Sequence, residues 1–217
     1  MRALVFALIL LSACAPSEPA EPVTEPSAPE AAVPAPADTL AITADDRALA
    51  DRPEAPLRID GACPFEGCVY GPWTTSAETT VYAASGDTTS AAFTVPAGTM
   101  LEASDGFVLL TRLGEAVATE ATELFVTFEE SRPVAEGDTV LVLDYEGEGS
   151  YRLWHDGTLG FSGVGALDGP VQGDLPLRQT AAPEAQWWAR VTAPDGRAGW
   201  LWMDRTPDVT GADALSG

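Results

Sequence analysis

The chain has 217 residues, with 33 aspartates and glutamates against 11 arginines and no lysine, and its formal net charge is −22 at pH 7. This excess of negative charge repels phosphate backbones and anionic lipid surfaces, so it disfavours nucleic-acid binding and electrostatic docking on a membrane. The roughly 150 residues from Leu57 to Thr206 carry the tryptophans and most other aromatic residues, which is enough chain for one medium or two small domains.

The first thirteen residues have the order of a secretion signal. Arg2 supplies a positive start, residues 3–11 form an apolar run, and the small residues Ser12 and Ala13 close the segment. An apolar run of about ten residues is too short for the roughly 30 Å hydrocarbon core of a bilayer, which a helix crosses with about twenty. We therefore expect residues 1–13 to be a cleaved signal peptide.

The four residues Leu11-Ser12-Ala13-Cys14 resemble the lipobox of bacterial lipoproteins. The resemblance implies cleavage after Ala13 and a diacylglyceryl thioether on Cys14, and two or more acyl chains hold a protein stably on a membrane. An aspartate after the cysteine is the usual signal for retention in the inner membrane, and this chain has Ala15 there. We therefore expect lipidation at Cys14 and an anchor in the outer membrane that faces the periplasm. The alternative is a secreted protein with an incidental cysteine.

The lipid-bearing Cys14 begins a linker over 14–38 that is rich in proline, alanine and glutamate and has no basic residue. Such a composition forms no core, and proline favours an extended backbone of about 3.1 Å per residue. We expect a tether of up to about 70 Å, with a docking site for a proline-recognising partner as the alternative. A lead-in over 39–56 follows, in which residues 44–50 are compatible with a helical turn.

Cys63 and Cys68 enclose four residues. In an oxidising compartment the default for such a pair is a structural disulfide. A redox-active pair usually has two intervening residues, and a metal site would need further ligands that are not clustered in the sequence. We therefore predict a disulfide, with redox and metal roles as the less favoured alternatives.

Short stretches rich in valine, threonine and aromatic residues recur between glycines and prolines, a pattern typical of antiparallel strands. Asp156-Gly157 separates two of these stretches and is a strong hairpin signal. Few segments have helical periodicity, so we expect an all-β fold. The predicted strands are 79–83, 92–95, 99–103, 107–113, 124–128, 138–145, 151–155, 158–161, 187–192 and 198–203.

A family resemblance is clearest over residues 137–203. It is carried by the segments Gly137 to Leu143, Tyr151 to Trp154, Trp187 to Val191, Asp195 to Arg197 and Gly199 to Leu201. They resemble the bacterial SH3-like (SH3b) domain, and Val81 to Ala103 is similar to its opening strands. The opening half lacks the family's Asn-Val-Arg-Ser-Gly-Pro signature. Because more chain is covered than one small barrel needs, the resemblance implies two degenerate SH3-like barrels, over 57–130 and 131–206, before a flexible tail at 207–217.

Few residues suggest catalysis. The one histidine, His155, precedes the Asp156-Gly157 turn, where we expect it to face solvent. The sequence contains no nucleophile elbow, zinc-protease helix, phosphate loop or calcium loop. We predict a protein that is not an enzyme and that has no cofactor and no metal. An enzyme with a pair of carboxylates is the least favoured alternative, because no pair stands out.

Tryptophan and arginine give the better candidate site. Side chains alternate along a strand, so Trp154 and Arg152 in one hairpin, and Trp188 and Arg190 in another, lie opposite apolar neighbours. If those neighbours form the core, these four side chains make an exposed surface suited to stacking on sugars or capturing a carboxylate. The alternative is that the arginines pair with glutamates and the tryptophans seal the contact between two barrels.

These features lead to two main functional expectations. Resemblance to the SH3-like family suggests a membrane-anchored binding protein for peptidoglycan or an envelope protein, although a fold alone does not fix function. The alternative is an acidic periplasmic inhibitor or accessory subunit of a cationic enzyme, for which the net charge of −22 provides the attraction.

Overall fold

The computed structural model describes residues 39–62, 64–65, 67–147, 149–164, 176–203 and 209–214. All of them lie within one compact unit, Val33–Gly217. The expected signal peptide, Cys14 and the tether lie outside these residues. No helix among the described residues has the length and apolar character that crossing a membrane requires.

The fold is all-β, as the sequence predicts: the described residues form strands in two sheets and no helix. The strands of the first sheet are β1 (Leu40–Thr43), β2 (Leu57–Asp60), β3 (Gly71–Thr75), β4 (Thr79–Tyr82), β5 (Ala91–Val95), β6 (Met100–Arg112), β14 (Glu184–Thr192), β15 (Ala198–Trp202) and β16 (Val209–Thr210). Its order is β1-β2-β6-β14-β15-β4-β5, with β3 pairing to β6 and β16 to β3. Only β1 and β2 pair in parallel among the described strands.

The strands of the second sheet are β7 (Gly114–Ala118), β8 (Thr122–Phe125), β9 (Ser131–Val134), β10 (Thr139–Gly147), β11 (Ser150–His155), β12 (Thr158–Gly163) and β13 (Leu177–Ala181). Their order is β13-β7-β10-β11-β12-β8-β9. Neither order, over the residues described, returns to its first strand to close a barrel, so the SH3-like barrels stay a prediction.

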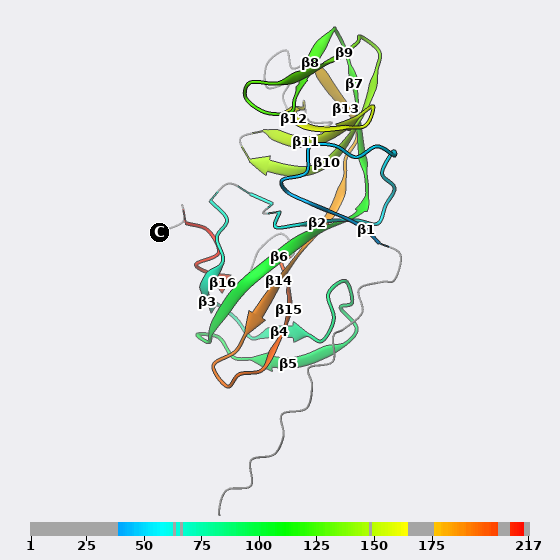
Figure 1. Cartoon of the computed structure of the whole chain (residues 1–217). Helices are drawn as coiled ribbons and strands as arrows, with labels where there is room; N and C mark the ends of the chain where they lie inside the picture. The colour runs from blue at the N-terminus through cyan, green and yellow to red at the C-terminus, as the bar shows by residue number, and fades with distance from the viewer. Residues whose placement is uncertain are drawn as a thin grey trace, which may run out of the picture. The chain divides into compact units, whose positions relative to one another are not determined.

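The sheets do not divide the chain at residue 130, where the sequence suggested a domain boundary. β6 in the first sheet runs almost directly into β7 in the second, and β13 in the second leads back to β14 in the first. β6 and β14 then pair side by side over nearly their whole length (Figure 1). Segments from both expected domains therefore build each sheet.

β10 is buried on both faces and joins the two cores. Val140 and Val142 pack into the core of the second sheet, whereas Leu141 and Leu143 pack into the core of the first. This two-sided burial explains why residues 140–143 of β10 are all apolar and do not alternate with polar residues.

The lead-in over 44–50 is not a helical turn, in contrast to the expectation. The amide of Leu49 donates to the carbonyl of Gly157 (3.1 Å), and the amide of Leu159 donates to the carbonyl of Arg47 (3.0 Å). These hydrogen bonds hold the segment along the β11–β12 hairpin. The backbone groups that form them are not available for helical hydrogen bonds.

Candidate functional site

The four residues expected to form an exposed tryptophan–arginine surface do not come together. Trp154 and Arg152 lie on β11 in the second sheet, whereas Trp188 and Arg190 lie on β14 in the first. Trp188 is 0% exposed and Arg152 is also buried. The expected exposed surface is therefore wrong: the prediction assumed that one face of each hairpin meets solvent, whereas Arg152 and Trp188 are buried and Trp154 and Arg190 are half-buried.

Each of these side chains has a structural partner. The indole of Trp188 stacks on Trp202, with 6.2 Å between ring centroids, and the indole of Trp154 donates to the carbonyl of Leu49 (2.8 Å). The guanidinium of Arg190 lies 5.7 Å from the ring centroid of Trp200. The ion pair of Arg152 with Glu146 is of the kind that the alternative expected for the arginines, whereas a contact between two barrels sealed by the tryptophans stays a prediction.

The predicted disulfide is only partly described. Cys68 is disulfide-bonded, but Cys63 lies outside the described residues, so the pairing stays a prediction.

His155 is more covered than expected: its side chain is 19% exposed, and its Nε2 lies 3.3 Å from Oδ2 of Asp138. Among the described residues, no group of three histidines, cysteines or acidic residues could hold a metal ion.

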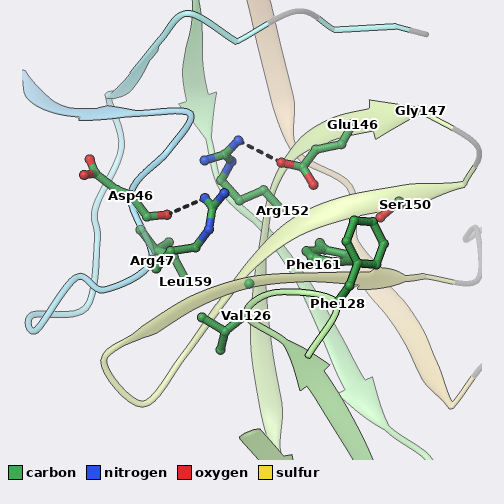
Figure 2. A pocket seen from close by; sticks show the side chains of 11 residues that line it. Asp46, Arg47, Val126, Phe128, Glu146, Gly147, Ser150, Arg152, Leu159 and Phe161 are labelled. Atoms are coloured by element: carbon green, nitrogen blue, oxygen red, sulfur yellow. Dashed lines mark hydrogen bonds and ion pairs between the residues drawn. The ribbon is translucent and has the colours of Figure 1, made fainter. Parts of the chain in front are cut away.

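The structure instead contains a pocket of about 530 Å³, which we call the Phe161 pocket (Figure 2). This volume lies within the range of small-molecule sites, about 300–1,000 Å³. The lead-in, the β8–β9 loop, β10, β11 and β12 all contribute to it. Its lining residues are Asp46, Arg47, Val126, Phe128, Glu146, Gly147, Ser150, Arg152, Leu159, Gly160 and Phe161.

Aromatic rings form the apolar side of the pocket. Phe161 on β12 contacts Phe128 edge to face, with 5.6 Å between ring centroids, and stacks on Phe125 at 5.9 Å. Phe128 is 95% exposed, although a side chain of this size is usually covered. An exposed aromatic cluster beside a pocket is a feature typical of binding sites.

The β8–β9 loop holds Phe128 in a fixed turn. The hydroxyl of Thr127 accepts hydrogen bonds from the amides of Glu129 (3.1 Å) and Glu130 (3.0 Å). The amide of Val126 donates to the carbonyl of Glu130 (2.8 Å). Because these bonds order the loop before a ligand arrives, little conformational entropy remains to be lost on binding.

Arg152 forms the charged floor of the pocket. Its Nε donates to Asp144 (3.0 Å) and its Nη2 donates to Glu146 (2.7 Å), while its Nη1 donates to the carbonyl of Ala44 (2.8 Å). Burial raises the pKa of Asp144 to about 6, against the opposing attraction of Arg152. The guanidinium is thus fully engaged, and it fixes the lead-in against the second sheet.

Of the residues that line the pocket, only Arg152 was among the predicted site residues. Arg47 and Phe128 lie about eighty residues apart in the chain, and the prediction continued the strand through 128, whereas β8 ends at Phe125. One signal was available: Thr127 lies two residues before Glu129, and a threonine in this position is compatible with a turn in which its hydroxyl accepts from the backbone amides that follow. Comparison with protein-family models, curated proteins and solved structures gives no match to this chain.

Proposed function

We propose that this protein is a non-enzymatic lipoprotein of the bacterial cell envelope that binds peptidoglycan in the Phe161 pocket. In this proposal the lipid on Cys14 anchors the chain in the outer membrane, and the proline-rich segment over 14–38 spans the distance to the wall. The rigid all-β unit then presents the pocket.

The observation that carries the proposal is the combination of surfaces in the pocket. Phe128 and Phe161 offer aromatic faces on which the apolar face of a sugar ring can stack. Arg47, Glu146 and Ser150 supply charged and hydroxyl groups for the polar groups of the same ligand. Peptidoglycan carries both sugar rings and charged peptides, so its chemistry matches this mixed lining.

Co-sedimentation of the full mature protein, in mild detergent, with purified peptidoglycan tests this function. We expect the wild type to bind, and Phe128→Ala to lower the affinity at least about tenfold, because exposed aromatic anchors dominate many interfaces. Met100→Ala is the matched control, since Met100 is also exposed but does not line the pocket. Absence of wild-type binding, or equal losses in both variants, would overturn the proposal.

The anchor has its own test. We expect intact-mass analysis of material from a bacterial host to give a chain that begins at a lipid-modified Cys14. Cys14→Ser should move the protein from the membrane fraction to the soluble fraction. An unprocessed start or an unmodified sulfur in the wild type would contradict the anchor.

Phe128 also favours the second candidate, an acidic inhibitor or accessory subunit. The exposed ring is followed by Glu129 and Glu130, a pattern suited to an apolar hollow with a basic rim in a cationic enzyme. Inhibition of a cationic muramidase that weakens as salt is added would support this candidate. If the Phe128→Ala variant inhibited the muramidase as strongly as the wild type, the result would argue against this second candidate.

A further inference from the structure

Arg47 differs from most arginines of this acidic chain because it makes no ion pair with any described residue. Six other described arginines lie within 4 Å of a carboxylate: Arg52, Arg58, Arg112, Arg132, Arg152 and Arg197. With 33 acidic residues in the chain, an arginine without a carboxylate partner is unexpected. This arginine lines the Phe161 pocket.

The two carboxylates that line the pocket, those of Asp46 and Glu146, each accept a hydrogen bond from a group other than Arg47. Oδ2 of Asp46 accepts a hydrogen bond from the amide of Thr43 (2.7 Å), and Oε1 of Glu146 accepts one from Arg152 (2.7 Å). Asp144 is also bound to Arg152. The two acidic residues of the lining therefore accept from other donors, and Arg47 makes no ion pair with any carboxylate of the described residues.

The guanidinium of Arg47 is held in place along one edge. Its Nη1 donates to the carbonyls of Ala44 and Asp46, each at 3.1 Å, and Figure 2 shows it beside Arg152 at the wall of the pocket. Its Nε and Nη2 make no hydrogen bond with a described residue. These two donors form the edge of a guanidinium that matches the two oxygens of a carboxylate.

We propose that Arg47 binds a carboxylate of the ligand while Phe161 and Phe128 cover the adjoining apolar face. This inference rests on the proposed function and specifies which part of peptidoglycan the pocket recognises. A free carboxylate occurs in peptidoglycan at the ends and side chains of the stem peptides, and on the lactyl ether of the glycan where the peptide has been removed. Arg47 would make the same contact with a stem-peptide carboxylate as with the lactyl carboxylate.

Calorimetric titration of the full mature protein with three soluble fragments tests the inference. The fragments are a disaccharide-peptide, the same molecule with its carboxylates converted to amides, and the peptide-free disaccharide with its lactyl carboxylate. We expect the disaccharide-peptide or the peptide-free disaccharide to bind at least about tenfold more tightly than the amidated fragment, because a guanidinium–carboxylate pair is charged and bidentate. Tight binding of the peptide-free disaccharide identifies the sugar carboxylate as the source, and weak binding of it identifies the peptide.

Two variants test whether Arg47 itself is responsible for the preference for a carboxylate. Arg47→Gln should lose the preference for the carboxylate form, whereas Arg178→Gln should keep it. Arg178 is a matched control because it is exposed, makes no ion pair with a described residue and does not line the pocket. An unchanged melting temperature of Arg47→Gln would confirm that the loss reflects binding.

The possible failures are distinguishable. Equal affinities of the wild type for the carboxylate and amide forms, or an undiminished preference in Arg47→Gln, would overturn the role of Arg47 and leave the proposed function standing. Absence of wild-type binding to intact peptidoglycan would overturn both.

Discussion

Arg152 and Asp144 form an ion pair that is almost completely shielded from solvent. Nε of Arg152 lies 3.0 Å from Oδ1 of Asp144, and the two side chains are 6% and 3% exposed. The same guanidinium donates to the carbonyls of Thr43 and Ala44 in the lead-in. One side chain thus joins two strands of the second sheet to the last residue of β1 in the first sheet and to the residue that follows it.

Removal of Arg152 should therefore be costly. We expect Arg152→Met to lower the free energy of unfolding by about 3–5 kcal/mol, because it leaves the buried carboxyl of Asp144 without its partner. Urea unfolding followed by tryptophan fluorescence measures the change. Arg132→Met is the control: its partner Glu130 lies at 2.6 Å, but both side chains are about half exposed, so the cost should be at most about 1 kcal/mol. Equal costs would contradict the interpretation.

The raised pKa of Asp144 predicts a specific pH dependence. Burial raises this pKa to about 6 in the folded state, whereas an aspartate in the unfolded chain has a pKa of about 3.9. The folded state then binds the proton more tightly, so the stability that protonated Asp144 contributes is fully present below about pH 4 and is lost as the pH rises through 6.

Comparison with Asp144→Asn isolates this effect. The free energy of unfolding of the wild type minus that of Asp144→Asn should fall between pH 4 and 6, by up to about 3 kcal/mol, and stay level above pH 7. The negative charge of Glu146 also raises the pKa of Asp144. Glu146→Gln should therefore lower that pKa and reduce the pH range over which the stability difference falls. A difference that stays constant from pH 4 to 7 would show that the pKa is not raised.

Most strands from 79 onward could be predicted because their chemistry is local. Alternating residues and the Asp156-Gly157 turn place β11 at Ser150–His155 and β12 at Thr158–Gly163, close to the predicted 151–155 and 158–161. β1, β2 and β3 were missed, as were β7, β9, β13 and β16. The two connections between the sheets could not be predicted either. Only one residue separates β6 from β7, so no loop in the sequence marks the change from one sheet to the other.

Gly106 explains one strand error. The prediction broke the strand between 103 and 107, but β6 continues through this glycine. A Cβ at Gly106 would lie 2.6 Å from the carbonyl oxygen of Trp188 and would also clash with the hydroxyl of Tyr70. The glycine therefore permits a close approach between strands, which the sequence alone does not distinguish from a turn.

The burial of Trp188 predicts a structural role in place of the expected binding role. We expect Trp188→Ala to cost about 3–5 kcal/mol of unfolding free energy, because it removes the stacking on Trp202 and leaves a cavity. Denaturant unfolding followed by circular dichroism measures the loss. Phe128→Ala, which removes an exposed ring, should change stability by no more than about 0.5 kcal/mol. A small effect of Trp188→Ala would indicate that this side chain is not packed in the core.

The β11–β12 turn provides a test in which backbone conformation alone is changed. Asp156 and Gly157 have φ of 43° and 79°, so both central residues adopt the left-handed region that a type I′ turn requires. A Cβ added at Gly157 would lie 3.8 Å from the nearest atom, the carbonyl oxygen of Ala50, which leaves room for a methyl group. Gly157→Ala should therefore cost about 1–2 kcal/mol through strain. Asp156→Asn should be nearly neutral, because asparagine tolerates this conformation.

Hydrogen exchange at Leu49 measures the same strain. The amide of Leu49 donates to the carbonyl of Gly157, so this amide should exchange faster in Gly157→Ala than in the wild type. Equal stabilities and equal exchange in the two variants would show that the turn does not limit the stability of the hairpin.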